Sequence, residues 1–368
     1  MSTKHATNYN LTMGSLNKLV PTTRYQGSKR KILPWLYKNL KKLEFDTVLD
    51  GFGGTASVSY LLKKMGKEVT FNDILRSNYL SGIAIIENES ATLTNEDIRF
   101  ILNENGFDYS SFIQENFKDI YYLDDENKWL DVVVQNIHML SEIYDGGILK
   151  KKQAIAFHAL FQACLVKRPY NLFHRNNLYM RLANVERSFG NKKTWDTGFE
   201  KMLLRFSDEL SHKIFSNGRS NIAHCENILK MKAGNYDLVY LDPPYTKSEQ
   251  HVPIDYYNLY HFLEGIADYH NWKDRIDWTK KHRCLINGKP SWDKKSIITN
   301  FDSLFCKFKD SMLVISYGDP GYPSVDEIKQ LLGQYKNKID IRRKEYKYGL
   351  NHTHKNGNKL YEALIIAQ

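Results

Sequence analysis

The sequence has few of the residues from which metal and redox sites are built. Its four cysteines stand far apart in 368 residues: Cys164, Cys225, Cys284 and Cys306. No two of them have the close spacing of a zinc or redox motif, so we expect reduced, mostly buried thiols. His352 and His354 have no acidic or thiol partner nearby in the sequence. We therefore expect no metal site.

Long hydrophobic runs are also missing. No stretch approaches the roughly 20 apolar residues that a membrane-spanning helix needs. The opening residues, MSTKHATNYN, lack the apolar core of a secretion signal. Hydrophobic residues make up 42% and charged residues 26%, the balance of a soluble globular protein. These features predict a cytoplasmic protein without membrane contacts, long enough for a catalytic core and a smaller domain.

Acidic residues are outnumbered by basic ones. There are 42 Asp and Glu against 52 Lys and Arg, which gives a formal net charge of +10. An excess of this size favours a polyanionic partner such as a nucleic acid. Charge alone does not identify that partner, because many basic proteins bind no nucleic acid.

The first structured segment has the pattern of a cofactor site. We expect a short strand beginning at Val48, a glycine loop, a helix over 57–64 and a second strand over 68–71. The loop contains three glycines: Gly51, Gly53 and Gly54. Asp73 follows the second strand, at the distance from the loop where an acid binds the ribose of a nucleotide-like cofactor. A purely structural glycine turn stays open as the alternative.

A second signal stands in the stretch YDLVYLDPPY, residues 236–245. Its apolar part predicts a buried strand, which Pro243 and Pro244 end because proline has no backbone donor. Ligands of open α/β sheets bind at such strand ends. Asp242 and the carbonyl of Pro243 can accept both hydrogens of a base amine, so that its lone pair points at an electrophile. Tyr245 offers a flat face for stacking a flipped base.

Helical periodicity dominates from about residue 80 to residue 215. Within this part, the segment over 167–195 mixes basic, aromatic and asparagine side chains. Basic residues bind phosphates, Asn and Arg read base edges, and aromatic rings stack on bases. An irregular surface loop held by its aromatic residues is the alternative interpretation. The candidate DNA contacts are Arg168, Tyr170, Asn171, Arg175, Arg181, Lys192 and Lys193.

Strand patterns return after residue 220. We expect further strands over 312–317, 339–346 and 359–366, the last two on either side of a hairpin-like turn, KNGNK. Sheet elements on both sides of a helical segment predict one α/β domain interrupted by an insertion. We therefore predict a tail over 1–20, a Rossmann-like catalytic domain over 21–80 and 216–368, and a mainly helical inserted domain over 81–215.

Three motifs together carry a family resemblance: RYQGSK at 24–29, DGFGGTASVSY at 50–60 and DPPY at 242–245. In this order the chain resembles the adenine-N6 DNA methyltransferases of the Dam type, also called the D12 class, in their alpha arrangement. The resemblance is good over about 21–85 and 165–250. It implies S-adenosylmethionine as methyl donor and double-stranded DNA as substrate. It also implies that the inserted domain recognises the target sequence.

The resemblance also implies roles for single residues. Asp73 would hold the ribose hydroxyls, and the loop from Asp50 to Gly54 would pass under the methionine part of the cofactor. The implied cofactor contacts are Tyr25, Lys29, Asp50, Phe52, Gly53, Gly54, Asp73 and Asp242. The implied holders of the target adenine are Asp242, Pro243, Pro244 and Tyr245.

The chain departs from the family pattern at three places. Tyr25 stands where some relatives have tryptophan. Glu226 and Asn227 occupy the place of an Asp-Phe pair that often contacts the cofactor adenine. The stretch from Thr246 to Asp310 is longer than the family leads us to expect, and the sequence gives it no function.

Several alternatives to this activity stay open. One is methylation of cytosine N4, although such enzymes more often have serine in place of Asp242. Others are an RNA substrate, an inactive DNA-binding relative, and a nicotinamide oxidoreductase, which would leave the Asp-Pro-Pro-Tyr motif unexplained. Ring-carbon methylation of cytosine needs a cysteine nucleophile, usually after proline, and no cysteine here follows proline. We also expect the target base to be flipped out of the duplex and the protein to be a monomer or a weak dimer. A restriction endonuclease is a candidate partner.

Overall fold

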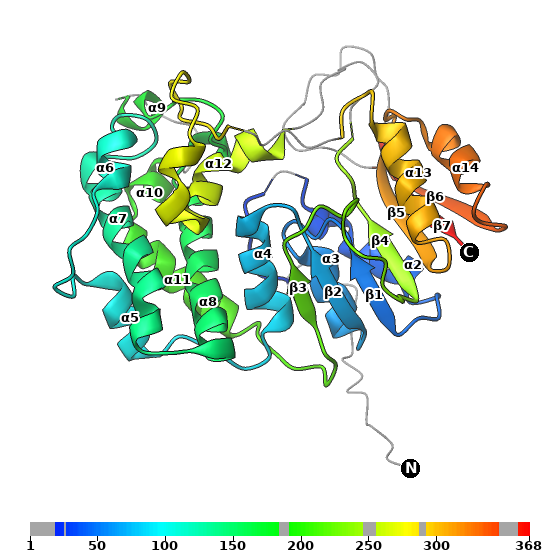
Figure 1. The fold of residues 1–368 in the computed structure, drawn as a ribbon, viewed down its shortest axis with the longest axis horizontal. Helices are drawn as coiled ribbons and strands as arrows, with labels where there is room; N and C mark the ends of the chain where they lie inside the picture. The colour runs from blue at the N-terminus through cyan, green and yellow to red at the C-terminus, as the bar shows by residue number, and fades with distance from the viewer. Residues whose placement is uncertain (1–18, 26, 184–190, 246–254, 287–291, 346–359) are drawn as a thin grey trace.

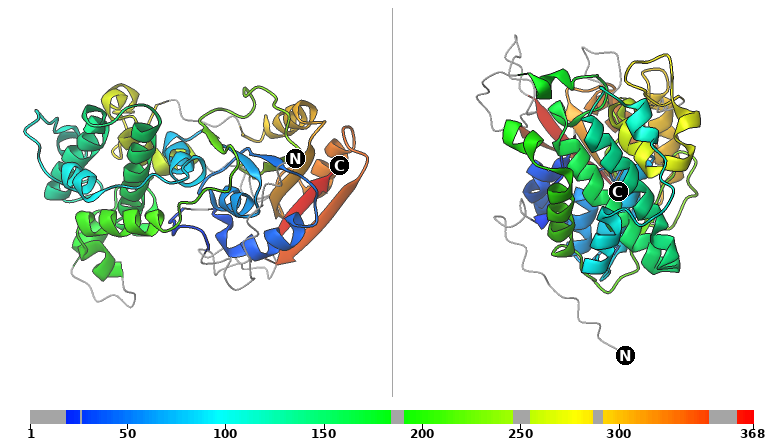
Figure 2. Two further views of the ribbon diagram at one scale, coloured as in Figure 1. Left: turned by 90° about the horizontal axis from the view of Figure 1, so that it is seen from below. Right: turned by 90° about the vertical axis from the view of Figure 1, so that its left-hand side faces the viewer.

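The structure, a computed structural model, describes residues 19–25, 27–183, 191–245, 255–286, 292–345 and 360–368 (Figure 1). It has two halves, a sheet flanked by helices and a group of helices beside that sheet (Figure 2). The turn KNGNK, His352, His354 and most of the tail expected over 1–20 lie outside the described residues. Val20, at the end of that tail, is buried in the core of the sheet half.

Seven strands form one sheet. They are β1 (Thr47–Asp50), β2 (Glu68–Asn72), β3 (Ile222–His224), β4 (Leu238–Leu241), β5 (Met312–Asp319), β6 (Ile339–Glu345) and β7 (Tyr361–Ala367). Their order across the sheet is β3-β2-β1-β4-β5-β7-β6, and β7 runs antiparallel to both of its neighbours while the other pairs are parallel. This topology confirms the predicted α/β, Rossmann-like methyltransferase sheet. The strand order reverses between β1 and β4, so a ligand site is expected at their carboxyl ends.

Helices cover both faces of the sheet, as parallel strands require. They are α2 (Leu33–Leu40), α3 (Ser57–Lys64), α13 (Ile297–Lys307) and α14 (Val325–Leu332). Val48 of β1 and Leu238 of β4 pack with α2 and α3. Their neighbours Leu49 and Val239 pack on the other face with α13 and α14. The alternation follows from the two-residue repeat of a strand, which places successive side chains on opposite faces of the sheet.

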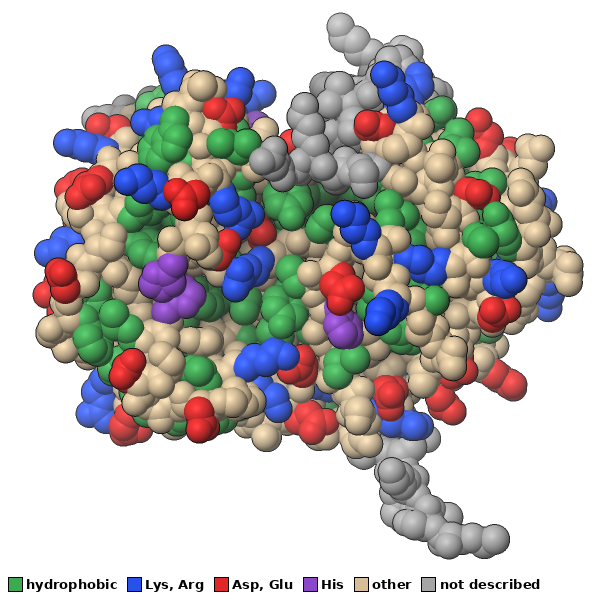
Figure 3. All heavy atoms as spheres, in the orientation of Figure 1, with side chains coloured by type: hydrophobic (Ala, Val, Ile, Leu, Met, Phe, Trp, Pro, Cys, Tyr) green, Lys and Arg blue, Asp and Glu red, His purple; other side chains and the backbone are tan. Residues whose placement is uncertain are grey.

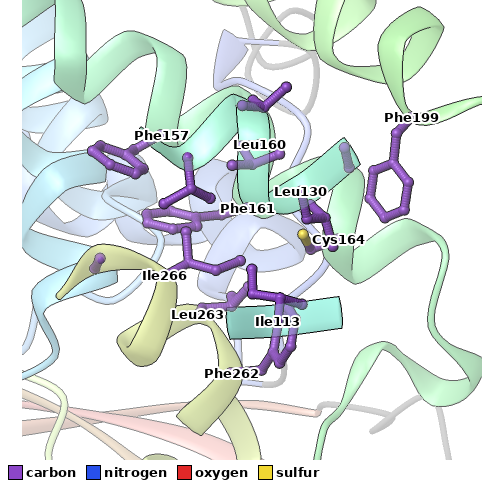
Figure 4. Close-up of a cluster of buried hydrophobic side chains, with 14 of the residues drawn as sticks. Ile113, Leu130, Phe157, Leu160, Phe161, Cys164, Phe199, Phe262, Leu263 and Ile266 are labelled. Atoms are coloured by element: carbon purple, nitrogen blue, oxygen red, sulfur yellow. The ribbon is translucent and has the colours of Figure 1, made fainter. Parts of the chain in front are cut away.

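The second half is helical. Its elements are α4 (Arg76–Gly82), a π-helical turn η2 (Ile83–Glu87), α5 (Asn95–Leu102), α6 (Phe112–Asn116), α7 (Asp124–Met139), α8 (Gly146–Val166), α9 (Tyr179–Leu182), α10 (Asn191–Asp196), α11 (Phe199–Ser211) and α12 (Tyr256–Ala267). In Figure 4, the α8 side chains Phe157, Leu160, Phe161 and Cys164 lie among residues of α6, α7, α11 and α12. Helix α8 is buried on most of its surface, and is therefore the central helix of this half. Along the described part of the chain, no helix is long and apolar enough to cross a membrane.

Residues 255–286 belong to this helical core although they follow the catalytic motif in sequence. Tyr260, Phe262 and Trp272 are buried in the same cluster as α7 and α8. The Glu264 carboxylate of α12 accepts hydrogen bonds from the backbone N–H groups of Arg76 and Ser77 at 2.9 and 2.8 Å, at the amino end of α4. The helical half is therefore assembled from two separate parts of the sequence, an arrangement that hydrophobic periodicity alone did not predict.

Candidate active site

A cavity of about 110 Å³ opens at the carboxyl ends of β1, β2 and β4, where the strand order reverses. Its wall consists of Gly51, Phe52, Asn72, Asp73, Ile74, Glu226, Asn227, Ile228, Pro244, Tyr256, Tyr257 and Trp292. The wall thus brings together Gly51 and Phe52 of the glycine loop, the acid after β2 and Pro244 of the Asp-Pro-Pro-Tyr motif. Glu226 and Asn227, at the place where this chain departs from the family pattern, also lie on it.

The glycine loop packs tightly against β2 and uses its own amides. A Cβ atom on Gly53 would lie 2.0 Å from the Phe71 ring, so only glycine fits there. The N–H of Gly53 donates to the Asn72 carbonyl at 2.8 Å, and the N–H of Gly54 donates to the Asp73 carboxylate at 2.8 Å. Because these donors are already bonded, the loop does not offer the free amides that bind the pyrophosphate of a nicotinamide dinucleotide.

Three carboxylates surround the loop: Asp50 and Asp73 are buried, and the Asp242 side chain is 20% exposed. Burial raises the pKa of Asp50 to about 7 and the pKa values of Asp73 and Asp242 to about 6. Asp50 accepts a hydrogen bond from the Ser59 hydroxyl through Oδ2 at 2.6 Å. Its buried Oδ1 atom has no hydrogen-bond partner among the described residues. In their ionised form these carboxylates attract a positively charged ligand and repel a pyrophosphate, and a bound cation would in turn favour their ionisation. The site therefore fits a sulfonium cofactor that also carries an ammonium group.

Asp73 also has a structural role, because each of its carboxylate oxygens accepts a hydrogen bond from a backbone N–H group. Oδ2 accepts the Gly54 N–H and Oδ1 accepts the Leu75 N–H, each at 2.8 Å. The carboxylate thereby fixes the glycine loop and the approach to α4 at once. Each oxygen keeps a second lone pair, so a ribose hydroxyl can still donate to it.

Lys29 connects two carboxylates beside the cavity. It begins the short helix η1 (Lys29–Ile32), and its Nζ atom lies 3.0 Å from Asp242 Oδ1 and 2.8 Å from Glu362 Oε1. The Ser316 hydroxyl donates to the same Glu362 oxygen at 2.6 Å. Burial alone would lower the pKa of Lys29, but the Asp242 and Glu362 carboxylates raise it well above its ordinary value. The lysine is therefore a fixed positive charge that orients Asp242.

Sequence analysis missed Glu362. It lies in β7, and its side chain is 1% exposed, with apolar residues on both sides in the sequence. A charged residue within a buried strand requires a partner, because an isolated buried charge is very costly. That signal was present in the stretch YEALIIA, although the sequence could not identify Lys29 as the partner.

The catalytic motif follows β4 directly and packs against β5. Pro244 lines the cavity, and Pro243 is buried behind it. The Tyr245 ring lies 5.0 Å from the Tyr317 ring of β5. A Cβ atom on Gly318 would lie 2.5 Å from the Tyr245 ring, so the glycine in the β5 sequence SYGD permits this close approach. The absence of a side chain at Gly318 therefore leaves room for the Tyr245 ring to pack against β5.

Tyr25 connects the first motif to α12. Its ring is nearly parallel to the Tyr260 ring at a centroid distance of 4.3 Å, and to the Tyr256 ring at 5.8 Å. The Asn78 amide donates to the Tyr25 hydroxyl at 3.2 Å. Tyr256 also lines the cavity, together with Tyr257 and Trp292, so the long stretch after the catalytic motif completes the cavity wall. No sequence motif predicted that these three aromatic residues would line the cavity.

The candidate DNA contacts fall into two groups. Arg168 is 1% exposed and donates to the carbonyls of Leu172 and Arg175, while Arg181 makes two bonds to the Glu126 carboxylate at 2.8 and 2.9 Å. Their burial and partners favour a structural role for both side chains. In contrast, Tyr170 is 62% exposed, and Arg175 and Lys193 are also exposed. Asn171 is half-buried, and the Lys192 side chain lies outside the described part of the structure.

Known proteins resemble this chain over nearly its whole length. Residues 25–307 match the family described as D12 class N6 adenine-specific DNA methyltransferase. One similar protein is the Type II methyltransferase M2.HphI of Haemophilus parahaemolyticus, with 27% identity over 359 residues, which are 96% of this chain and 99% of that protein. The family match covers far more than half of the chain and includes residues 25–29 of the first motif and all of the other two. This chain therefore belongs to the D12 class of N6 adenine-specific DNA methyltransferases.

Proposed function

We propose that the chain methylates an adenine that has been flipped out of a specific double-stranded DNA sequence, with the cofactor in the 110 Å³ cavity. Membership of the family establishes the reaction class, which is methylation of adenine N6 in DNA, and implies S-adenosylmethionine as the methyl donor. The observation that carries the finer proposal is the ion pair of Lys29 and Asp242 beside that cavity, with side chains that are 10% and 20% exposed.

Residues on the cavity wall, together with Asp50 just before it in the chain, suit the parts of the cofactor. Asp73 would accept the ribose hydroxyls, and the buried Oδ1 atom of Asp50 would face the ammonium group. Ile74 and Ile228 offer apolar surface for the adenine ring, with Glu226 and Asn227 at its edge. When bound, S-adenosylmethionine supplies an electrophilic methyl group on a sulfonium.

Asp242 would prepare the target amine. Its carboxylate accepts one amino hydrogen and the Pro243 carbonyl accepts the other, so the nitrogen lone pair points toward the methyl group. Lys29 holds Oδ1 of Asp242 at 3.0 Å, which leaves the second oxygen for the amine. Tyr245 would stack on the flipped base. This arrangement costs no reorganisation at the moment of reaction, which is the source of its catalytic advantage.

The other activities that the sequence left open fit less well. Methylation of cytosine N4 and an RNA substrate disagree with the adenine-specific DNA family. The bonded loop amides and three acids oppose a nicotinamide dinucleotide. An inactive relative would be expected to lose Asp242 or the glycine loop, and both are intact.

We further propose that the chain is the modification enzyme of a restriction–modification pair. The similar protein is a Type II methyltransferase, and the two chains align over nearly their full lengths. The partner would be a restriction endonuclease of the same specificity. A monomer or weak dimer acting in the cytoplasm fits this role.

Asp242→Ala should lower the turnover of methyl transfer at least about 100-fold, because one preorganised acceptor of the amine is removed. DNA binding should remain, and Lys29 keeps Glu362 as a partner. The measurement is incorporation of labelled methyl groups into unmethylated, whole-genome-amplified DNA. The control is Asp310→Ala, which changes an exposed acid just before β5 begins, at the end of the strand away from the site. Full activity of Asp242→Ala would refute the proposed role.

Glu362→Gln should move the acid limb of the turnover profile to lower pH. Glu362 contributes to the raised pKa of Asp242, so its neutralisation lowers that pKa. Activity needs ionised Asp242, so it is present above the pKa of Asp242 and lost as the pH falls through it. Glutamine keeps an oxygen for Ser316 and Lys29. The measurement is turnover between pH 5 and 8 with both substrates saturating.

Glu200→Gln changes an exposed acid of α11 and is the matched control for the pH profile. Its acid limb should coincide with that of the unmodified protein. An acid limb of Glu362→Gln that stays in place or moves to higher pH contradicts the electrostatic role of Glu362.

Asp73→Ala should raise the dissociation constant for S-adenosylmethionine roughly 10- to 150-fold, since a charge-assisted hydrogen bond is worth about 1.5–3 kcal/mol. Thermal stability should also fall, because Asp73 holds the N–H groups of Gly54 and Leu75. Calorimetry with S-adenosylhomocysteine and its 2′-deoxy analogue separates the two effects. The unmodified protein should prefer the ribose form, and Asp73→Ala should lose that preference. An unchanged preference leaves Asp73 with a structural role alone.

Arg175 and Arg181 form a matched pair for the surface that we propose reads DNA. Arg175 is exposed, so Arg175→Ala should make the slope of log affinity against log salt shallower by about 0.9, or relax the sequence preference. Arg181 is bound to Glu126, so Arg181→Ala should lower the unfolding free energy by about 1.5–3 kcal/mol and leave the salt slope unchanged. Salt titrations and thermal melts measure both. The reverse pattern would place DNA contact at Arg181.

A further inference from the structure

The long stretch after the catalytic motif contains a short hairpin. Ile276 pairs antiparallel with Leu285, and the Asp277 N–H donates to the Cys284 carbonyl at 2.7 Å. At the tip, the Asp277 carboxylate accepts the Thr279 N–H at 3.0 Å and the Arg283 N–H donates to the Lys280 carbonyl at 3.0 Å. These bonds give an exposed segment a defined shape. We refer to residues 275–286 as the post-motif hairpin.

The tip of the post-motif hairpin is basic and aromatic. Residues 277–284 hold two lysines, one arginine and one histidine against a single acid, Asp277. Trp278 is 43% exposed, and Lys280 and Lys281 are exposed as well. The Arg283 guanidinium lies 5.0 Å from the centre of the Trp278 ring and donates to the Trp278 carbonyl at 3.1 Å. An exposed indole with cations beside it suits a ligand that carries both phosphates and flat rings.

A buried hub joins the post-motif hairpin to the loop that carries the exposed DNA-contact candidates. The Tyr121 hydroxyl lies 2.5 Å from the Phe173 carbonyl and 2.8 Å from the His282 carbonyl. It also lies 2.8 Å from His261 Nε2. The Arg168 guanidinium covers the Tyr121 ring at 4.3 Å. Arg168 therefore supports, from the interior, two surface segments that are about a hundred residues apart in sequence.

The same hub places the post-motif hairpin next to the cavity. His282 Nε2 lies 3.2 Å from the Asn258 side-chain oxygen in the first turn of α12. Tyr256 and Tyr257 of that turn line the cavity. In Figure 1 the hairpin, in yellow, and α9 both lie at the upper end of the helical half. Seen from the side in Figure 2, the yellow segment and the green helices of that end are set apart from each other. In Figure 3, blue Lys and Arg side chains alternate there with green hydrophobic ones.

We propose that the post-motif hairpin is a second DNA-contacting element, which binds the target duplex together with the exposed residues of the 170–183 loop. The inference rests on the proposed function. It assigns part of target recognition to residues that follow the catalytic motif, outside the insertion over 81–215. The lysines would contact phosphates, and Trp278 would stack on a base or on a sugar edge.

The test uses the full chain and a duplex containing the sequence that the protein methylates, found by long-read sequencing of whole-genome-amplified DNA after treatment. Lys280→Ala combined with Lys281→Ala should make the salt slope shallower by about 0.9 for each phosphate that is no longer neutralised. Trp278→Ala should weaken binding roughly 5- to 150-fold, and Trp278→Phe should restore most of it. Calorimetric affinity for S-adenosylmethionine should stay unchanged in all of these variants.

Lys329→Ala combined with Lys338→Ala is the control, since these exposed lysines lie in and after α14 in the sheet half (Figure 1). An equal change of slope in the control would mean a general charge effect and would overturn the inference. So would unchanged slope and affinity in the hairpin variants of a protein that methylates DNA normally. If the unmodified protein methylates no DNA at all, the proposed function fails first and the inference with it.

Discussion

The ion pair between Lys29 and Asp242 is the interaction on which the rest of the site depends. A lysine that is 10% exposed needs strong compensation, and two carboxylates at 3.0 and 2.8 Å provide it. One of these carboxylates comes from the catalytic motif after β4 and the other from β7. Lys29 and its two partners therefore connect the amino-terminal motif, the Asp-Pro-Pro-Tyr motif after β4 and the last strand, β7. Removing Lys29 would leave two carboxylates without their cation, whereas removing either carboxylate would leave Lys29 paired with the other.

The surroundings of this pair explain why the site suits a cationic cofactor. Asp50 and Asp73 add two further buried carboxylates around a loop whose amides are already bonded. The local charge is therefore negative, with Lys29 fixed on Asp242 and Glu362 and unable to neutralise the loop. A dinucleotide with two phosphates would meet repulsion where a sulfonium meets attraction.

Helix α12 makes the two halves one functional unit. Its first turn supplies Tyr256 and Tyr257 to the cavity, and its Glu264 caps the amino end of α4. Its Asn258 contacts the hairpin through His282. The proposed DNA contact at the hairpin would therefore have a short, packed route to the cavity.

The sequence predicted the catalytic half well because its signals are local. The glycine loop, the helix over 57–64 and the strand before Asp242 follow from residue spacing alone, and all are present. β3 was missed because it has only three residues. Long-range pairing was beyond the sequence: nothing local distinguishes Arg175, which is exposed, from Arg168 and Arg181, which are buried against carbonyls and Glu126. Glu362 was missed for the same reason, since its partner Lys29 is 333 residues away.

The most direct test of the account is a crystal structure of the protein with a target duplex and sinefungin, a stable analogue of the methyl donor. The account predicts a flipped adenine stacked on Tyr245, with its N6 atom within hydrogen-bonding distance of Asp242 and of the Pro243 carbonyl. Lys29 should remain between Asp242 and Glu362. An adenine that is flipped but has its N6 atom away from Asp242, or a Lys29 that has left Asp242 for the ligand, would contradict the account.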